Sequence, residues 1–335
     1  MRAVIHPLYQ QIGQELKLGT VHSAGVIQSL WGGYGELVRL HFAERNVIVK
    51  HVGLPKPSAH PRGWNTDRSH QRKLRSYQVE VNWYQHFSLL TDAQWRAPVG
   101  LMCRQTEHEW LIVMEDLAQA GFPDTIKQAN KTHLRACLTW LANFHARFIG
   151  CQTRQLWETG TYWHLDTRPD EWQALSDEEL KCHARLIDQT LRSACYPTLV
   201  HGDAKLANFC FTPDGNQAAA VDFQYVGHGC AMKDVALFMS SAVEPQACEQ
   251  MEHWVLDCYF DALETALARY QPSLNRASVE QAWRPLFALA WADFQRFVKG
   301  WSPEHWKINP YTESLTARAL KELKGVHAAS PGGAD

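Results

Sequence analysis

The segment from Leu199 to Phe211, with the sequence LVHGDAKLANFCF, holds three polar side chains suited to phosphate chemistry: Asp203, Lys205 and Asn208. Asp222 follows in the sequence AVDFQ. Phosphoryl transfer from ATP needs a carboxylate near the acceptor hydroxyl, oxygen ligands for Mg²⁺ and a cation beside the phosphates. Because these residues supply all three, they predict a phosphoryl-transfer site.

Short β-like runs must position these residues. The runs cover 198–211 and 218–223, and Asp214 with Gly215 predicts a tight turn between them. A hairpin there would bring Asp222 back beside Asp203 and Asn208.

The N-terminal third of the chain has the pattern of a small β-sheet. Residues 26–42 contain two apolar-rich runs around a cluster of three glycines, which predicts a β-hairpin with a flexible tip. A further strand is expected over 47–52, where Lys50 is the single lysine in an otherwise β-branched run. We infer that its charge has a function. The glycines of the hairpin tip are Gly32, Gly33 and Gly35.

Helices and one more strand follow. Residues 77–90 have helical apolar spacing around Glu80, which predicts a helix. Residues 110–114 predict a buried strand, and Glu115-Asp116-Leu117 leads from it into a polar loop. A strong amphipathic pattern over 134–148 predicts a long helix after a polar loop. We therefore expect a nucleotide-binding lobe over 1–117 and a helical catalytic and substrate lobe over 118–328.

The spacing of Asp203 and Asn208 resembles the H-x-D-x-x-x-x-N loop of the protein-kinase-like superfamily. His-Gly-Asp in place of His-Arg-Asp is similar to the branch of aminoglycoside phosphotransferases and choline kinases. The ecdysteroid-kinase-like family is closer still, with its Asp-Phe-Gln, Glu-Asp-Leu and Y-x-x-E motifs. In this chain those motifs are Asp222-Phe223-Gln224, Glu115-Asp116-Leu117 and Tyr77 to Glu80.

The resemblance implies an α+β, protein-kinase-like fold of two lobes with ATP in the cleft. It also implies that Asp203 is the catalytic base, assisted by Lys205, and that Asn208 and Asp222 hold Mg²⁺. Lys50 would contact the phosphates and pair with Glu80, and Glu115 and Leu117 would contact the nucleotide at the hinge. Gly32, Gly33 and Gly35 do not spell G-x-G-x-x-G, but backbone contact with phosphate is still expected there.

Composition excludes several other classes of protein. The formal net charge of −2 offers no field for nucleic acid or an anionic membrane. We interpret the basic stretch 62–75 as a solvated loop, the alternative being a flap over a phosphorylated ligand. Nine cysteines without a Cys-x-x-Cys pair, and no apolar signal segment, indicate a soluble cytoplasmic protein with reduced thiols. No protein partner is evident.

Alternatives remain for both chemistry and acceptor. A nucleotide-binding pseudokinase would keep the fold without catalysis, and a choline kinase or an aminoglycoside phosphotransferase would keep the chemistry with another acceptor. The acceptor is expected to be a hydroxylated small molecule, and the many aromatic residues favour a partly apolar one. His201 and Asp234 are interpreted as structural, the latter as a polar anchor of the catalytic loop. Candidate residues of the acceptor pocket wall are Trp163, Arg168, Asp293 and Arg296.

Overall fold

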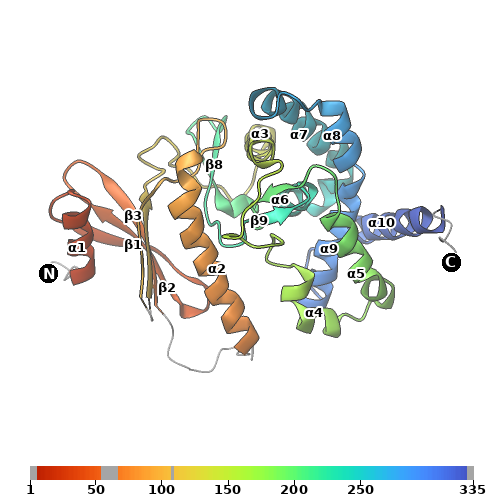
Figure 1. The fold of residues 1–335 in the computed structure, drawn as a ribbon, viewed down its shortest axis with the longest axis horizontal. Coiled ribbons are helices and arrows are strands. Elements are labelled where there is room, and N and C mark those ends of the chain that lie inside the picture. The colour runs from red at the N-terminus through yellow and green to blue at the C-terminus, as the bar shows by residue number, and fades with distance from the viewer. Residues whose placement is uncertain (1–5, 54–66, 107–108, 330–335) are drawn as a thin grey trace. The chain divides into compact units, whose positions relative to one another are not determined.

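The computed structural model describes residues 6–53, 67–106 and 109–329 (Figure 1). The chain divides into two compact units. The first contains Met1–Thr125, Cys210–Asp214 and Ala218–Gln224, and the second contains the remaining residues. The predicted lobe boundary after residue 117 stays a prediction.

A five-stranded antiparallel sheet is the centre of the first unit. Its order is β1 (Ser23–Ser29), β2 (Gly35–His41), β3 (Asn46–Gly53), β5 (Glu109–Glu115) and β4 (Gly100–Gln105). The predicted hairpin and the two predicted strands correspond to β1, β2, β3 and β5. Strand β4 was not predicted.

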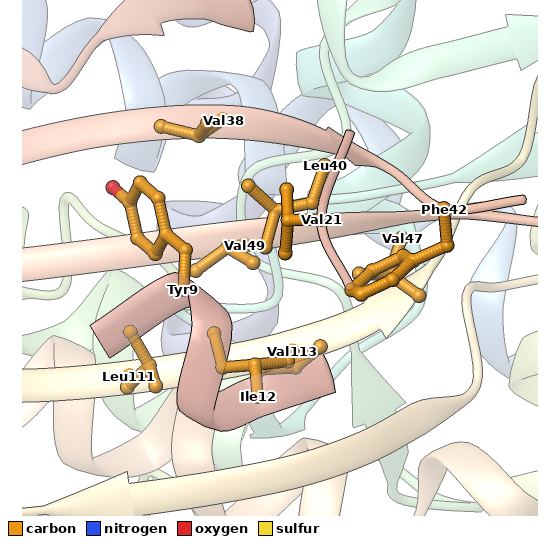
Figure 2. Close-up of a cluster of buried hydrophobic side chains, with 10 residues drawn as sticks. All are labelled: Tyr9, Ile12, Val21, Val38, Leu40, Phe42, Val47, Val49, Leu111 and Val113. Atoms are coloured by element: carbon orange, nitrogen blue, oxygen red, sulfur yellow. The ribbon is translucent and has the colours of Figure 1, made fainter. Parts of the chain in front are cut away.

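One face of this sheet is covered by α1 (Pro7–Glu15), which the sequence pattern did not predict. Figure 2 shows Tyr9 and Ile12 of this helix against valines and leucines that alternate along the strands. Because successive side chains of a strand point to opposite faces, Val47 and Val49 on this face place Lys50 on the other. The cluster of Figure 2 contains Tyr9, Ile12, Val21, Val38, Leu40, Phe42, Val47, Val49, Leu111 and Val113.

The opposite face of the sheet packs against α2 (Asp67–His86). The prediction of a solvated loop over 62–75 is wrong from Asp67 onward, where this helix begins; residues 62–66 lie outside the described residues. Lys73 donates to Gln224 Oε1 at 2.8 Å, and its Nζ is 4.6 Å from the Tyr77 ring centroid. The local composition predicted a loop for this basic segment, whereas these tertiary contacts stabilise it as a helix.

The second unit is mainly helical. Helix α9 (Leu286–Trp301) contacts five helices of this unit: α4 (Pro169–Ala174), α5 (Glu178–Arg192), α6 (Met232–Ala242), α8 (Arg276–Trp283) and α10 (Pro310–Ala329). The predicted amphipathic helix is α3, which packs on α7. Helix α3 covers Lys131–Phe148, and α7 covers Cys248–Tyr270.

Short strands flank the predicted catalytic segment. β6 (Thr198–Val200) pairs with β9 (Gly227–Gly229), and β7 (Phe209–Phe211) pairs with β8 (Ala218–Ala220). The expected α+β class is confirmed, with an antiparallel sheet in the N-terminal region and helices in the C-terminal region. None of the helices in the described ranges combines the length and the apolar character that a membrane crossing requires.

Candidate active site

Three predicted site residues meet in the first unit. Lys50 Nζ donates to both carboxylate oxygens of Glu80, at 2.8 and 2.7 Å, and to Asp222 Oδ1 at 2.9 Å. Lys50 is 5% exposed and Glu80 1% exposed, whereas the Asp222 side chain is 33% exposed. One buried ammonium therefore holds two carboxylates, of which only Asp222 is open to a ligand.

Burial and charge act in opposite directions within this group. Burial alone would lower the pKa of Lys50, but Asp222 and Glu80 raise it above its ordinary value, so this ammonium stays charged. Burial raises the pKa of Glu80 to about 7, with Lys50 lowering it and Asp222 raising it. The Asp222 carboxylate, which is partly exposed, is an oxygen ligand of the kind that a hard cation prefers.

The backbone of Asp222 is strained and held by neighbouring side chains. Its φ is +69°, in the left-handed region that non-glycine residues rarely adopt. Gln224 Nε2 donates to Asp222 Oδ1 at 2.7 Å, and Gln224 Oε1 accepts from Lys73. These bonds keep the carboxylate in one orientation, which is how strained conformations persist at functional sites.

The remaining predicted nucleotide contacts also belong to the first unit. Gly32 and Gly33 have φ of +73° and +76° in the turn between β1 and β2, and a Cβ on Gly35 would approach His51 O to 2.0 Å. Glu115 pairs with Arg96, and Leu117 is buried against Phe122 and Ala219 in an apolar cluster. Contact of these five residues with a nucleotide stays a prediction.

The predicted base lies in the second unit with two of its proposed partners. Asp203 is 5% exposed, and its Oδ2 accepts from Lys205 Nζ at 2.8 Å and from Asn208 Nδ2 at 3.1 Å. Asn208 Nδ2 also donates to the Asp203 carbonyl at 2.8 Å. A short 3₁₀ turn over Leu206–Asn208 brings the amide back to the carboxylate.

Asp234 anchors the loop that carries Asp203, as the sequence interpretation proposed. Its carboxylate accepts from the backbone N–H groups of His201 at 2.5 Å and Gly202 at 2.9 Å. His145 Nε2 lies 3.1 Å from the same carboxylate. His201 is fully buried, and its Nδ1 accepts a hydrogen bond from the backbone N–H of Asp203 at 3.3 Å. It therefore has the structural role that the sequence interpretation gave it.

Gly202 is required by the path of this loop. Its φ is +78°, and a Cβ there would meet Tyr225 O at 2.1 Å and Thr161 N at 2.7 Å. A Gly202→Ala variant should lose about 1–3 kcal/mol of unfolding free energy, measured in urea, and most of its phosphoryl transfer. Gly150→Ala is the control, because Gly150 has φ +74° but open space. Equal stability losses in the two variants would contradict the close packing.

The donor set fits a magnesium ion bound with a nucleotide. Both hydrogen bonds of the Asn208 amide nitrogen go to Asp203 oxygens, so the amide orientation is fixed. The Asn208 amide oxygen accepts no side-chain hydrogen bond from the described residues. Asp222 offers a partly exposed carboxylate. The two oxygens belong to different units, and each is of a kind that Mg²⁺ binds.

The predicted wall residues do not line an open pocket. Trp163, Asp293 and Arg296 are fully buried, and Arg168 is 9% exposed. Asp293 accepts from Trp163 Nε1 at 3.0 Å and from Arg296 at 2.9 Å. Trp163, Asp293 and Arg296 belong to a buried network of the core, which spacing alone could not distinguish from a pocket.

Asp293 neutralises two buried cations. Lys233 Nζ lies 3.2 Å from Asp293 Oδ2, and Lys233 and Arg296 are each at most 1% exposed. Burial alone would raise the pKa of Asp293, but Lys233 and Arg296 lower it to about 2. Because this folded-state pKa is lowered, the stability that Asp293 contributes is present above about pH 4 and is lost as pH falls towards 2.

An Asp293→Asn variant should therefore lose about 3–5 kcal/mol of unfolding free energy at pH 7, because two buried cations lose their counter-charge. Urea denaturation measures the loss, and its size should shrink between pH 4 and pH 2. Asp257→Asn, at an exposed ion pair with Arg284, is the control and should change little. A loss that grows on acidification would contradict the assignment.

Two residues near Asp203 were missed in the sequence. The backbone N–H of Tyr162 donates to the carbonyl of Gly202, next to Asp203, at 3.2 Å. Burial first, and then the Asp203 charge, raise the pKa of Tyr162 well above its ordinary value. Asp203 and Lys205 also act electrostatically on Lys307. Tyr162 directly precedes Trp163, one of the predicted wall residues, whereas Lys307 has no such neighbour among them.

Comparison with solved structures finds similar chains at low identity. A microcompartment-associated aminopropanol kinase is 14% identical, with 96% of this chain and 98% of that chain covered and a TM-score of 0.48. An aminoglycoside phosphotransferase from Streptomyces rimosus, solved with ADP and streptomycin, is 16% identical, with 84% and 99% covered and a TM-score of 0.45. Choline kinase from Streptococcus pneumoniae is 15% identical, with 96% and 100% covered and a TM-score of 0.42.

Sequence comparison identifies the family. No curated protein matches this chain. Residues 65–270, more than half of the chain, match the phosphotransferase enzyme family. The match includes Glu80, Asp203, Asn208 and Asp222, and begins after Lys50. The resemblance to the phosphotransferase branch is thereby confirmed, and the chain belongs to the phosphotransferase enzyme family.

Proposed function

We propose that the protein is an ATP- and Mg²⁺-dependent kinase that transfers the γ-phosphoryl group to a hydroxyl of a small molecule. The observation that carries the proposal is the Asp203 carboxylate, held by Lys205 and Asn208 in the second unit. The Lys50 ammonium with Asp222 in the first unit supports it. In this proposal both sets of residues act on one nucleotide.

Asp203 orients the acceptor hydroxyl and takes its proton. As the acceptor oxygen forms its bond to the γ-phosphorus, the O–H bond breaks towards the Asp203 carboxylate, and the bond from the γ-phosphorus to the bridging oxygen of ADP breaks. Lys205, at 2.8 Å from Asp203, stabilises charge on the transferred group. Lys50 binds the α- and β-phosphates of the nucleotide.

Mg²⁺, when bound, would neutralise phosphate charge, and Asn208 and Asp222 are the residues proposed to hold it. The strained backbone of Asp222 and its bond from Gln224 keep its carboxylate ready for this role. Gly32, Gly33 and Gly35 are proposed to contact phosphate, and Glu115 and Leu117 to contact the base of the nucleotide.

The proposed subtype is ecdysteroid-kinase-like, because of Asp222-Phe223-Gln224, Glu115-Asp116-Leu117 and Tyr77 to Glu80. Gln224 supports this subtype, since its amide group links Asp222 to Lys73 and the two links need both an N–H donor and an oxygen acceptor. Glycine, the residue of the Asp-Phe-Gly motif, could form neither link. A cytoplasmic location is part of the same proposal.

The test incubates the purified protein with Mg²⁺, γ-labelled ATP and a panel of hydroxylated small molecules. Label should move to at least one acceptor and should require Mg²⁺. ATP binding without transfer to any acceptor, and without slow hydrolysis, would favour the pseudokinase alternative and contradict the proposal.

A further inference from the structure

Lys307 is a cation near the proposed base that the proposed chemistry does not use. It lies between α9 and α10, where its Nζ is 5.0 Å from the Phe294 ring centroid and 5.5 Å from that of Trp306. Its Nζ donates to Ser240 Oγ at 3.0 Å. Across the described ranges, no carboxylate forms an ion pair with it. Its ammonium is therefore partly dehydrated and lacks a direct counter-charge.

The same elements connect Lys307 to the loop of Asp203. Ser241, next to Ser240 on α6, accepts from the backbone N–H of Leu206 at 2.9 Å. Burial lowers the pKa of Lys307 to about 8, Asp203 raises it and Lys205 lowers it further. Lys307 thus stays mostly protonated at pH 7 and lies within electrostatic range of the proposed base.

An apolar surface adjoins this ammonium. Trp306 is 58% exposed, which is unusual for a tryptophan. Its ring stacks on that of His305, which in turn is tilted against the ring of Trp301. Phe294, 5.0 Å from the Lys307 ammonium, contacts the ring of Tyr162, whose backbone N–H donates to the carbonyl of Gly202 at 3.2 Å in the loop of Asp203. The neighbourhood combines aromatic surface with positive charge.

We propose that Lys307 binds an anionic substituent, a carboxylate or a phosphate, on an acceptor whose aromatic or apolar body lies against Trp306. This inference rests on the proposed function, since it assigns the acceptor class of the same site. An anion would supply the counter-charge that Lys307 lacks. A cationic amino alcohol or aminosugar would instead face Lys307 and Lys205 together, which opposes its binding.

Four compounds on one benzyl alcohol scaffold test the proposal. They are 4-(hydroxymethyl)benzoate, 4-(hydroxymethyl)phenyl phosphate, the neutral 4-(hydroxymethyl)benzamide and the cationic 4-(hydroxymethyl)benzylamine. Ligand-observed NMR measures their binding without ATP, and label transfer from ATP is measured separately. The variants are Lys307→Met, Lys307→Arg and, as control, Lys321→Met at an exposed position of α10.

The full-length protein should bind an anionic compound at least about tenfold more tightly than the amide, the contribution typical of a charge-assisted hydrogen bond. The two anionic compounds show whether carboxylate or phosphate is preferred. Lys307→Met should abolish the preference over the amide, whereas Lys307→Arg and Lys321→Met should keep it. The amine should bind more weakly than the amide.

Three outcomes would overturn the inference: no binding of either anion at millimolar concentration, a preference that survives in Lys307→Met, or an equal decrease for all four compounds in that variant. The last would mean that Lys307 supports the binding of the shared benzyl alcohol scaffold and does not recognise the anionic group. Failure of label transfer with the binding preference intact would count against the proposed function instead, so the two failures are distinguishable.

Discussion

An Asp203→Asn variant is expected to lose about 10²–10⁴-fold in the turnover of phosphoryl transfer, the range that a positioned general base contributes. The amide has nearly the shape of the carboxylate, and its oxygen can still accept from Lys205 and Asn208. What it lacks is the negative charge that takes the hydroxyl proton. Steady-state kinetics with a labelled acceptor measures the loss.

Folding and nucleotide binding should be retained in Asp203→Asn, because the nucleotide contacts proposed in the first unit do not involve this residue. Thermal unfolding and a fluorescent ATP analogue provide these readouts. The matched control is Asp257→Asn, which removes an exposed carboxylate from α7. Normal turnover in a folded, nucleotide-binding Asp203→Asn protein would remove Asp203 from the mechanism.

A Lys50→Met variant is expected to lose both stability and activity. Its removal leaves Glu80, 1% exposed, without the ammonium that holds both its oxygens and lowers its pKa, so Glu80 has to take up a proton or stay charged without a partner. Breaking a buried pair on one side typically costs about 3–5 kcal/mol. Phosphoryl transfer should fall by at least about a hundredfold, since the proposed phosphate cation is also lost. Urea denaturation and kinetics measure the two effects.

A double variant, Lys50→Met with Glu80→Gln, separates the two roles of Lys50. It removes the buried acid that Lys50 holds, so part of the lost unfolding free energy should return, most clearly above pH 7 where Glu80 would otherwise have to ionise or bind a proton, while transfer stays low. Glu80→Gln alone keeps the Lys50 to Asp222 contact and is the matched control. Recovery of transfer in the double variant would mean that Lys50 acts on stability alone.

Local patterns predicted the elements that have strong periodicity. The strand around Lys50 and the amphipathic helix α3 follow from alternating and helical apolar spacing. Helix α1 and strand β4 escaped prediction. The α1 helix is short and buries only Tyr9, Ile12 and Gly13, and the β4 strand has no fully buried residue to mark its register. Both elements are stabilised by the sheet, which α1 covers and β4 extends, and local sequence patterns do not show this.

Residue type and spacing predicted which residues form the candidate site, but not the contacts and burial of those residues. The sequence around Lys73 does not show that this side chain donates a hydrogen bond to Gln224. It also does not show that this bond helps to keep the segment before Tyr77 helical. Burial likewise separates residues that look alike in sequence. Trp163 is fully buried with Asp293, whereas Trp306 is exposed beside Lys307. Only the packing of α9 against its neighbours makes that distinction.

The central claim is that Lys50, Asn208, Asp222 and Asp203 serve one nucleotide. The most direct measurement is a crystal structure of the protein with Mg²⁺ and a non-hydrolysable ATP analogue. We expect Lys50 Nζ within hydrogen-bond distance of a phosphate oxygen, Asn208 and Asp222 on the metal ion, and Asp203 facing the γ-phosphoryl group. A nucleotide bound away from these residues, or a metal ion held by others, would contradict the claim.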